Sequence, residues 1–122
     1  MQRPVLALAN IHPAIQKYIA TNRQRLVQEV EAAIAAHAVV VVGMGINPMP
    51  KKARKLLDAA GVAHHDMDYG NYFNMWRERN ALKMWTGWPT FPMVFVRGTL
   101  VGGASDVEKL IASGELKTML AV

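Results

Sequence analysis

The sequence predicts a single α/β domain, a three-layer sandwich with helices on both faces of a sheet, preceded by a short helical segment. Three observations support this class. Residues 38–42 form a run of small and β-branched residues that is the length of a strand and predicts one buried on both faces. Segments with helical spacing of apolar residues precede and follow that run. Two further short strands, residues 93–96 and 99–101, flank Arg97-Gly98, which predicts a hairpin turn.

Composition limits the classes of function. The chain has 122 residues, 52% of them hydrophobic, which suffices for one domain with a substantial core. The absence of cysteine excludes disulfides, thiolate metal sites and a cysteine nucleophile. No apolar run approaches the roughly 20 residues of a membrane helix, so we expect no membrane partner and a cytoplasmic location.

The net charge of +5 is spread along the chain. Its one basic cluster is Lys51, Lys52, Arg54 and Lys55, which we interpret as the solvated face of a helix. A basic balance attracts nucleic acid or acidic partners in general. The scattered arrangement argues against a nucleic-acid partner here.

Two helical segments are expected before the first strand. Isoleucines recur at every fourth position within residues 10–20, and these are Ile11, Ile15 and Ile19. Thr21 and Gln24 are spaced like a capping box, which predicts a second helix from about Asn22, unless the two segments are one kinked helix. The isoleucines need an apolar surface, either on the domain itself or on a second subunit, so a homodimer is one possible assembly.

Further helices alternate with the strands. After a loop rich in glycine and proline, Pro50 suits the first turn of a helix that ends before Gly61. Residues 72–85 predict another helix. The helix after the hairpin is expected to begin with Ser105 or Asp106 as its N-cap.

Residues 62–68 predict a strand of mixed polarity, nearer the edge of the sheet. His64, Asp66 and Asp68 would share one face of this strand. Three such ligands could hold zinc weakly. A row of polar residues on an edge strand is the simpler interpretation, and we expect no metal.

The segment 88–103 resembles the glutaredoxin family. It reads W-P-T-F-P-M-V-F-V-R-G-T-L-V-G-G, and the family segment is usually written W-P-T-x-P-x-[VL]-[FY]-[VI]-x-G-x-x-[VI]-G-G. Residues 47–53, N-P-M-P-K-K-A, are similar to the family's C-P-Y-C-K-K-A. Residues 113–116, S-G-E-L, are similar to a segment of its monothiol branch.

The resemblance implies a thioredoxin-like three-layer sandwich, with a mixed four-stranded sheet flanked by helices. It also implies a cis peptide bond before Pro92. The similar region is roughly residues 23–121. We therefore divide the chain into an N-terminal helical extension, residues 1–22, and a glutaredoxin-like domain, residues 23–122.

The sequence departs from the family motif at the residues that carry the family's chemistry. A glutaredoxin uses a cysteine thiolate at a helix N-terminus, where the pKa of the thiol is lowered, to attack a disulfide. Asn47 stands at that position and Pro50 at the second cysteine position, with Pro48 and Met49 between them. An amide can neither attack sulfur nor replace the thiolate that binds a [2Fe–2S] cluster. We expect no thiol–disulfide oxidoreductase activity and no resident cofactor.

The family's glutathione groove has counterparts in this sequence. The resemblance implies that basic side chains meet a glycine carboxylate, that a backbone segment pairs with the ligand, and that a helix N-terminus meets the γ-glutamyl end. These candidates are Arg79, Lys83, Phe91, Pro92, Gly103, Ala104, Ser105 and Asp106. Met44 replaces a family lysine, and Ser105 replaces an aspartate. Weak binding of glutathione or a similar γ-glutamyl peptide is one hypothesis, and an unused groove is the other.

Two functions of different classes follow. The first is a redox-inactive module that binds glutathione, a peptide or a protein partner. The second is a glutathione-linked redox protein, either a glutaredoxin-type disulfide oxidoreductase or an iron–sulfur-related protein, to which a partner supplies the thiol. A disulfide-exchange assay with glutathione distinguishes them.

Overall fold

A four-stranded mixed sheet is the middle layer of the protein. The computed structural model describes residues 2–71 and 73–121. The strands are β1 (Val39–Gly43), β2 (His65–Asp68), β3 (Met93–Val96) and β4 (Thr99–Gly102), in the order β2-β1-β3-β4. Strand β1 pairs in parallel with β2 and antiparallel with β3, and β3 pairs antiparallel with β4. The expected mixed sheet is confirmed.

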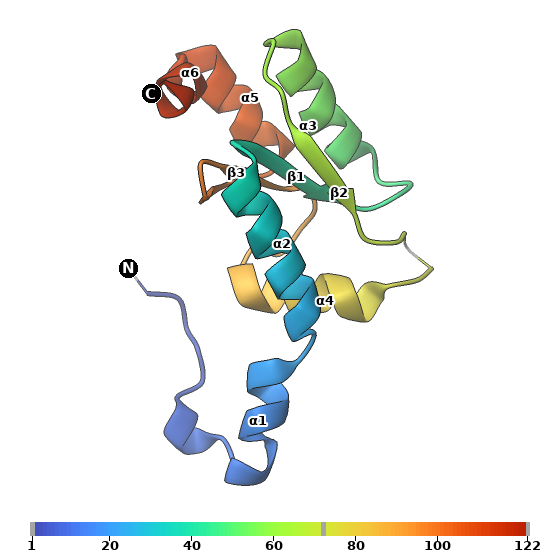
Figure 1. The fold of residues 1–122 in the computed structure, drawn as a ribbon, viewed down its shortest axis with the longest axis vertical. Helices are drawn as coiled ribbons and strands as arrows, with labels where there is room; N and C mark the ends of the chain where they lie inside the picture. The colour runs from blue at the N-terminus through green and yellow to red at the C-terminus, as the bar shows by residue number, and fades with distance from the viewer. Residues whose placement is uncertain (1, 72, 122) are drawn as a thin grey trace.

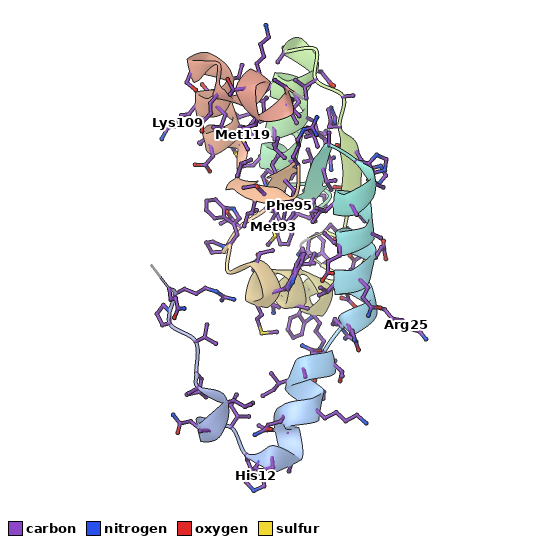
Figure 2. The ribbon with its side chains drawn as sticks, turned by 60° about the vertical axis from the view of Figure 1, so that its left-hand side comes forward. His12, Arg25, Met93, Phe95, Lys109 and Met119 are labelled. Atoms are coloured by element: carbon purple, nitrogen blue, oxygen red, sulfur yellow. The ribbon has the colours of Figure 1, made fainter. Side chains whose placement is uncertain are left out.

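Helices cover both faces of this sheet (Figure 1). Helices α2 (Gln24–Ala36) and α4 (Trp76–Thr86) pack on one face. Helices α3 (Pro48–Ala59), α5 (Ala104–Ser113) and α6 (Glu115–Leu120) pack on the other. The short helix η1 (Leu8–Asn10) and helix α1 (Pro13–Thr21) come first and lead away from the sheet. Figure 2 shows His12, at the start of α1, at the opposite end of the molecule from Lys109 and Met119.

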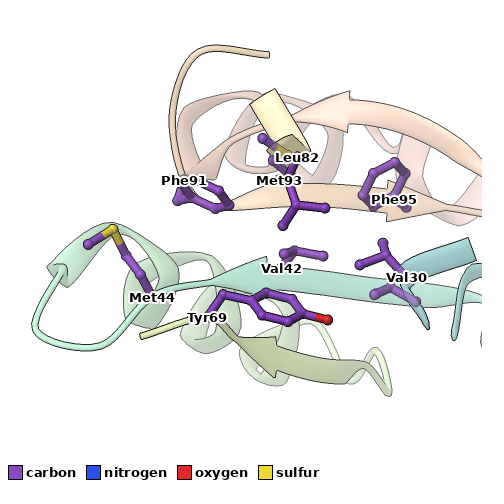
Figure 3. Packing of buried hydrophobic residues seen from close by; sticks show 9 residues of the cluster. Val30, Val42, Met44, Tyr69, Leu82, Phe91, Met93 and Phe95 are labelled. Carbon is purple, nitrogen blue, oxygen red and sulfur yellow. The ribbon is translucent and has the colours of Figure 1, made fainter. Parts of the chain in front are cut away.

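Strand β1 supports both cores because its valines alternate between them. Val40 and Val42 join the cluster beneath α2 and α4, where Figure 3 shows Val42 close to Leu82. Val39 and Val41 join the cluster beneath α3, α5 and α6. Each fully buried valine contributes about 1.5–3 kcal/mol relative to an exposed one. The prediction of a strand buried on both faces is confirmed.

Two helices begin earlier than expected. Helix α3 begins at Pro48 rather than Pro50, because the side chain of Asn47 caps it. Helix α5 begins at Ala104 with Gly103 at the N-cap, so Ser105 and Asp106 lie inside its first turn and neither is the cap.

Helix α4 begins later than expected. Residue 72, where the helix was predicted to begin, lies outside the described residues. The Asn71 side chain accepts a hydrogen bond from the Phe73 amide at 2.8 Å, and Met75 takes the left-handed conformation with φ 54°. The Phe73 hydrogen bond and the Met75 backbone therefore keep residues 73–75 out of the helix, which begins at Trp76.

The N-terminal segment differs from the expected capping box and speaks against one of the two surfaces considered for the isoleucines. The Thr21 hydroxyl donates to the Lys17 carbonyl at 2.7 Å, so it does not cap α2, and Arg23 with φ 52° separates α1 from α2. Ile15 and Ile19 remain 51% and 50% exposed, so they are not buried against the domain. No helix among the described residues has the length and apolar character needed to cross a membrane.

Ion pairs connect the edge strand β2 to α3. His64 Nε2 lies 2.7 Å from Asp58 Oδ1, and its Nδ1 lies 2.6 Å from Asp66 Oδ1. Arg54 Nη2 lies 2.8 Å from Asp68 Oδ1. The three side chains considered as zinc ligands are therefore engaged in ion pairs, and the described residues include no group of three ligands placed to hold a metal.

These contacts also set the charge of His64. Burial lowers the pKa of the imidazole, but the hydrogen bonds and charges of Asp58 and Asp66 together outweigh burial and raise that pKa above its ordinary value of 6.5. A raised pKa in the folded state means that the protonated ring stabilises the fold. That contribution is complete below the unfolded-state pKa and is lost as the pH rises through the folded-state pKa.

The substitution His64→Gln should therefore lower the melting temperature more at a pH of about 5.5 than at a pH of about 8.5. Circular dichroism melting curves of both proteins at each pH measure the difference. A difference that is constant, or that grows toward alkaline pH, would contradict this description of the ion pairs.

Candidate functional site

A groove of about 470 Å³ lies between the N-terminal ends of α3 and α5 and the loop before β3. Most of the expected binding residues line it, and these are Lys83, Phe91, Pro92, Gly103, Ala104, Ser105 and Asp106. Asn47 and Met49 line it from the start of α3. The sequence reasoning did not single out Trp88, Pro89 and Thr90 as part of the site, although they stand in the segment that carries the family resemblance.

The backbone N–H groups at the N-terminus of α3 are either absent or already hydrogen-bonded. Asn47 Oδ1 accepts a hydrogen bond from the Met49 amide at 2.9 Å. Pro48 and Pro50 have no N–H to offer. The first three residues of the helix therefore present no free backbone donor, so the free amides that help a helix N-terminus bind anions are missing at this end.

Pro50 is part of the core at this helix end. It is buried, and a β-carbon placed on Gly43 would lie 2.8 Å from its Cβ. The glycine that ends β1 thus leaves room for the proline. Pro50, at the position of the family's second cysteine, therefore has a packing role.

The N-terminus of α5 is built differently. Asp106 Oδ2 accepts a hydrogen bond from the Gly103 amide at 2.9 Å, which satisfies the N-cap residue itself. The amides of Ala104, Ser105 and Asp106 belong to the first turn, which has no acceptor inside the helix. Gly102 has φ 114°, and a side chain there would collide with the carboxylate of Asp106. This end of the groove keeps donors for an acidic group.

The loop before β3 supplies the third wall. Its Phe91–Pro92 peptide bond is cis, as the resemblance implied. Lys83 Nζ lies 5.8 Å from the centre of the Phe91 ring, which holds a cation beside the groove. The indole nitrogen of Trp88 is buried and has no hydrogen-bond partner among the described residues. A β-carbon on Gly103 would lie 3.9 Å from that nitrogen, so Trp88 packs beside the start of α5.

The structure does not place Arg79 among the residues that line the groove. The side chain is only 7% exposed. Its Nη1 donates to the carbonyls of Tyr69 and Asn74, at 3.0 and 2.6 Å. Arg79 therefore holds the turn before α4, and Lys83, one helical turn later, is the cation of the groove.

Tyr69 accepts a hydrogen bond from Arg79 through its carbonyl and contacts α2 through its hydroxyl. Its hydroxyl donates to Glu29 Oε1 at 3.1 Å. Burial and this hydrogen bond raise the pKa of Tyr69 far above its ordinary value, so the ring stays neutral. This phenol is a structural contact between α2 and the end of β2.

Comparison with known proteins identifies the family. The family model described as Glutaredoxin matches residues 48–101. The Glutaredoxin-like protein of Dictyostelium discoideum is 44% identical over 102 residues, which cover 84% of this chain and 83% of the relative. The chain belongs to the glutaredoxin family.

Other glutaredoxins agree in sequence and in fold. The Probable monothiol glutaredoxin 2 of Rickettsia typhi is 33% identical over 96 residues, covering 75% of this chain and 84% of the relative. A buckwheat glutaredoxin structure superposes with a TM-score of 0.70 at 22% identity, covering 86% of this chain and 92% of that one. The fold is the thioredoxin fold of glutaredoxins, here in a chain without cysteine.

The N-cap of α3 predicts how substitutions of Asn47 change the free energy of unfolding. Asn47→Ala should lower the free energy of unfolding by about 0.5–2 kcal/mol, because the Met49 amide loses its acceptor. Asn47→Asp should leave it unchanged or raise it, because a carboxylate also caps and is favoured at a helix N-terminus. Urea denaturation of the three proteins measures both effects. An alanine variant as stable as the parent would mean that Asn47 does not act as a cap.

Proposed function

We propose that this glutaredoxin-family protein is a redox-inactive binding module, whose groove receives glutathione or a similar γ-glutamyl peptide. The proposal rests on one observation, that the groove is formed while Asn47 caps a helix. The walls of the groove are assembled, while the residue at the nucleophile position is committed to capping α3. Binding without thiol chemistry is the function that fits both facts.

Three groups support recognition of such a ligand. Pairing between β1 and β3 begins at Met93, so the backbone of Phe91 lies outside the ladder and is available to an extended ligand. The ammonium of Lys83 suits one carboxylate of the ligand. The first turn of α5, with the Ser105 hydroxyl, suits the other. The buckwheat neighbour was solved as a glutaredoxin–glutathione complex, which also supports this choice of ligand.

The affinity should be low. Met44 and Ser105 are uncharged where the family resemblance implies a lysine and an aspartate. Each change removes a charge-assisted contact to the ligand. The sulfur of the ligand would face the amide of Asn47 and the thioether of Met49, neither of which forms a bond to it.

A nuclear magnetic resonance titration of the full chain with reduced glutathione tests the proposal. We expect saturable shifts at Phe91, Gly103 and Ser105, with a Kd in the millimolar range. Lys83→Glu should weaken binding several-fold, whereas Lys109→Glu, an equal charge change elsewhere on the surface, should not. Ser105→Asp should tighten binding, because it restores a partner for the ammonium of the γ-glutamyl group. No saturable shift, or equal losses in both lysine variants, would overturn the groove as the site.

A disulfide-exchange assay tests the redox half of the proposal. The alternative is a redox protein to which a partner supplies the thiol, and membership of the glutaredoxin family is the reason to test it. We expect no turnover of a small disulfide by glutathione above the uncatalysed rate. Turnover that depends on this protein, with or without an added dithiol protein, would contradict redox inactivity.

A further inference from the structure

One face of α3 forms a shallow hollow of about 430 Å³, which we call the lysine strip. Its residues recur at the spacings i, i+3, i+4, i+7, i+8 and i+11, which is one side of a helix. They are Pro48, Lys51, Lys52, Lys55, Leu56 and Ala59. The other side of α3, with Ala53 and Leu57, packs into the core. The strip therefore faces outward from an outer layer of the sandwich (Figure 1).

The strip has an apolar floor and a cationic rim. Pro48, Leu56 and Ala59 contribute only apolar side chains to it. Lysine side chains carry their charge at the end of a flexible apolar stem, so the stems cover the floor while the ammonium groups stay in water. A ligand that matches this surface has an apolar ridge bordered by acidic groups.

The charge of the rim is largely uncompensated. Lys52 Nζ lies 3.4 Å from Glu108 Oε2, but both side chains are about half exposed, at 48% and 55%, and such a pair contributes little. Neither Lys51 nor Lys55 forms an ion pair with any of the described residues. The one acid on the helix, Asp58, is bonded to the histidine that precedes β2.

A small anion does not match this surface. The first turn of α3 has no free amide, because two of its residues are prolines and the Met49 amide is bonded to Asn47. A phosphate would meet lysines alone and would leave the apolar floor unused. An anionic membrane would meet the rim, but its flat surface would not fill the hollow.

Ile46 lies in the loop just before the N-terminal end of the strip. Its side chain is 68% exposed, and its backbone is left-handed with φ 72°, which is costly for a β-branched residue. It lies two residues before Pro48. The loop before the strip therefore holds a bulky apolar side chain exposed to solvent.

We propose that the lysine strip binds an acidic amphipathic helix of a protein partner. Helix α3 has 12 residues and is about 18 Å long, so it can pair with a partner helix of about three turns. Leucines at i, i+4 and i+7 of the partner would lie on the floor, and flanking glutamates would meet the lysines. This surface is separate from the groove, and its use does not depend on glutathione.

The test uses a designed 15-residue peptide with leucines at those spacings, glutamates beside them and alanines elsewhere, titrated into the isotope-labelled full chain. We expect saturable shifts along α3 that weaken with added salt. Replacing the peptide's leucines by glutamine should weaken binding at least about tenfold, because charge alone does not fill the hollow.

A charge-swap design gives the matched controls. Lys51→Glu/Lys55→Glu should lose the acidic peptide and gain binding of the same peptide with lysines in place of glutamates. Lys109→Glu/Lys117→Glu, with the same change in net charge on α5 and α6, should behave like the parent. If the strip variant does not fold, Lys51→Ala/Lys55→Ala replaces it, with loss of binding expected and no gain.

Three results would overturn the proposal. They are shifts that map elsewhere than α3, equal losses in the strip variant and its control, and binding of vesicles rich in phosphatidylserine through the strip in preference to the peptide. Loss of glutathione binding with peptide binding intact would contradict only the proposed function of the groove.

Discussion

The hydrogen bond from the Met49 amide to Asn47 Oδ1 fixes where α3 begins, and both proposed binding surfaces depend on that point. It starts the helix at Pro48, directly after the loop that leaves β1. The side of the helix that carries Ala53 and Leu57 then meets the core, and the side that carries the lysines faces outward. Asn47 itself becomes part of the groove wall. The residue that the sequence resemblance aligns with the family's nucleophile thus caps a helix in this structure.

The two helix ends at the groove have opposite characters. The first turn of α3 has its donors removed by proline or used by Asn47, so it offers no free amide to a bound ligand. The first turn of α5 keeps its donors, with Asp106 bonded only to the N-cap amide. Positive charge beside the groove comes from Lys83 alone among the expected residues, since Arg79 is buried against carbonyls. The free donors and the cation of the groove therefore lie at α5 and Lys83, and the first turn of α3 adds no free amide.

Much of the fold could be predicted from the sequence because its signals were local. An unbroken run of valines predicts a strand buried on both faces, and β1 is such a strand. The segment from Trp88 to Gly103 carries the turn, strands and glycines of the family in order. The start of α3 was misplaced because two prolines fit a first turn and only the side-chain bond of Asn47 decides between them. Arg79 was placed in the groove by the family resemblance, which does not show that the carbonyls of Tyr69 and Asn74 bind its guanidinium in this chain. Thr21 bonds back to Lys17, a competing local contact that the capping-box spacing does not exclude.

The most direct test of the central claim, recognition without thiol chemistry, is to compare by calorimetry the affinities of glutathione and S-methylglutathione for the unmodified protein. The account predicts that both bind in the groove with Kd values within about threefold of each other, because no group near Asn47 requires a free thiol. Binding of the free thiol form alone, or saturable binding of neither ligand, would contradict it.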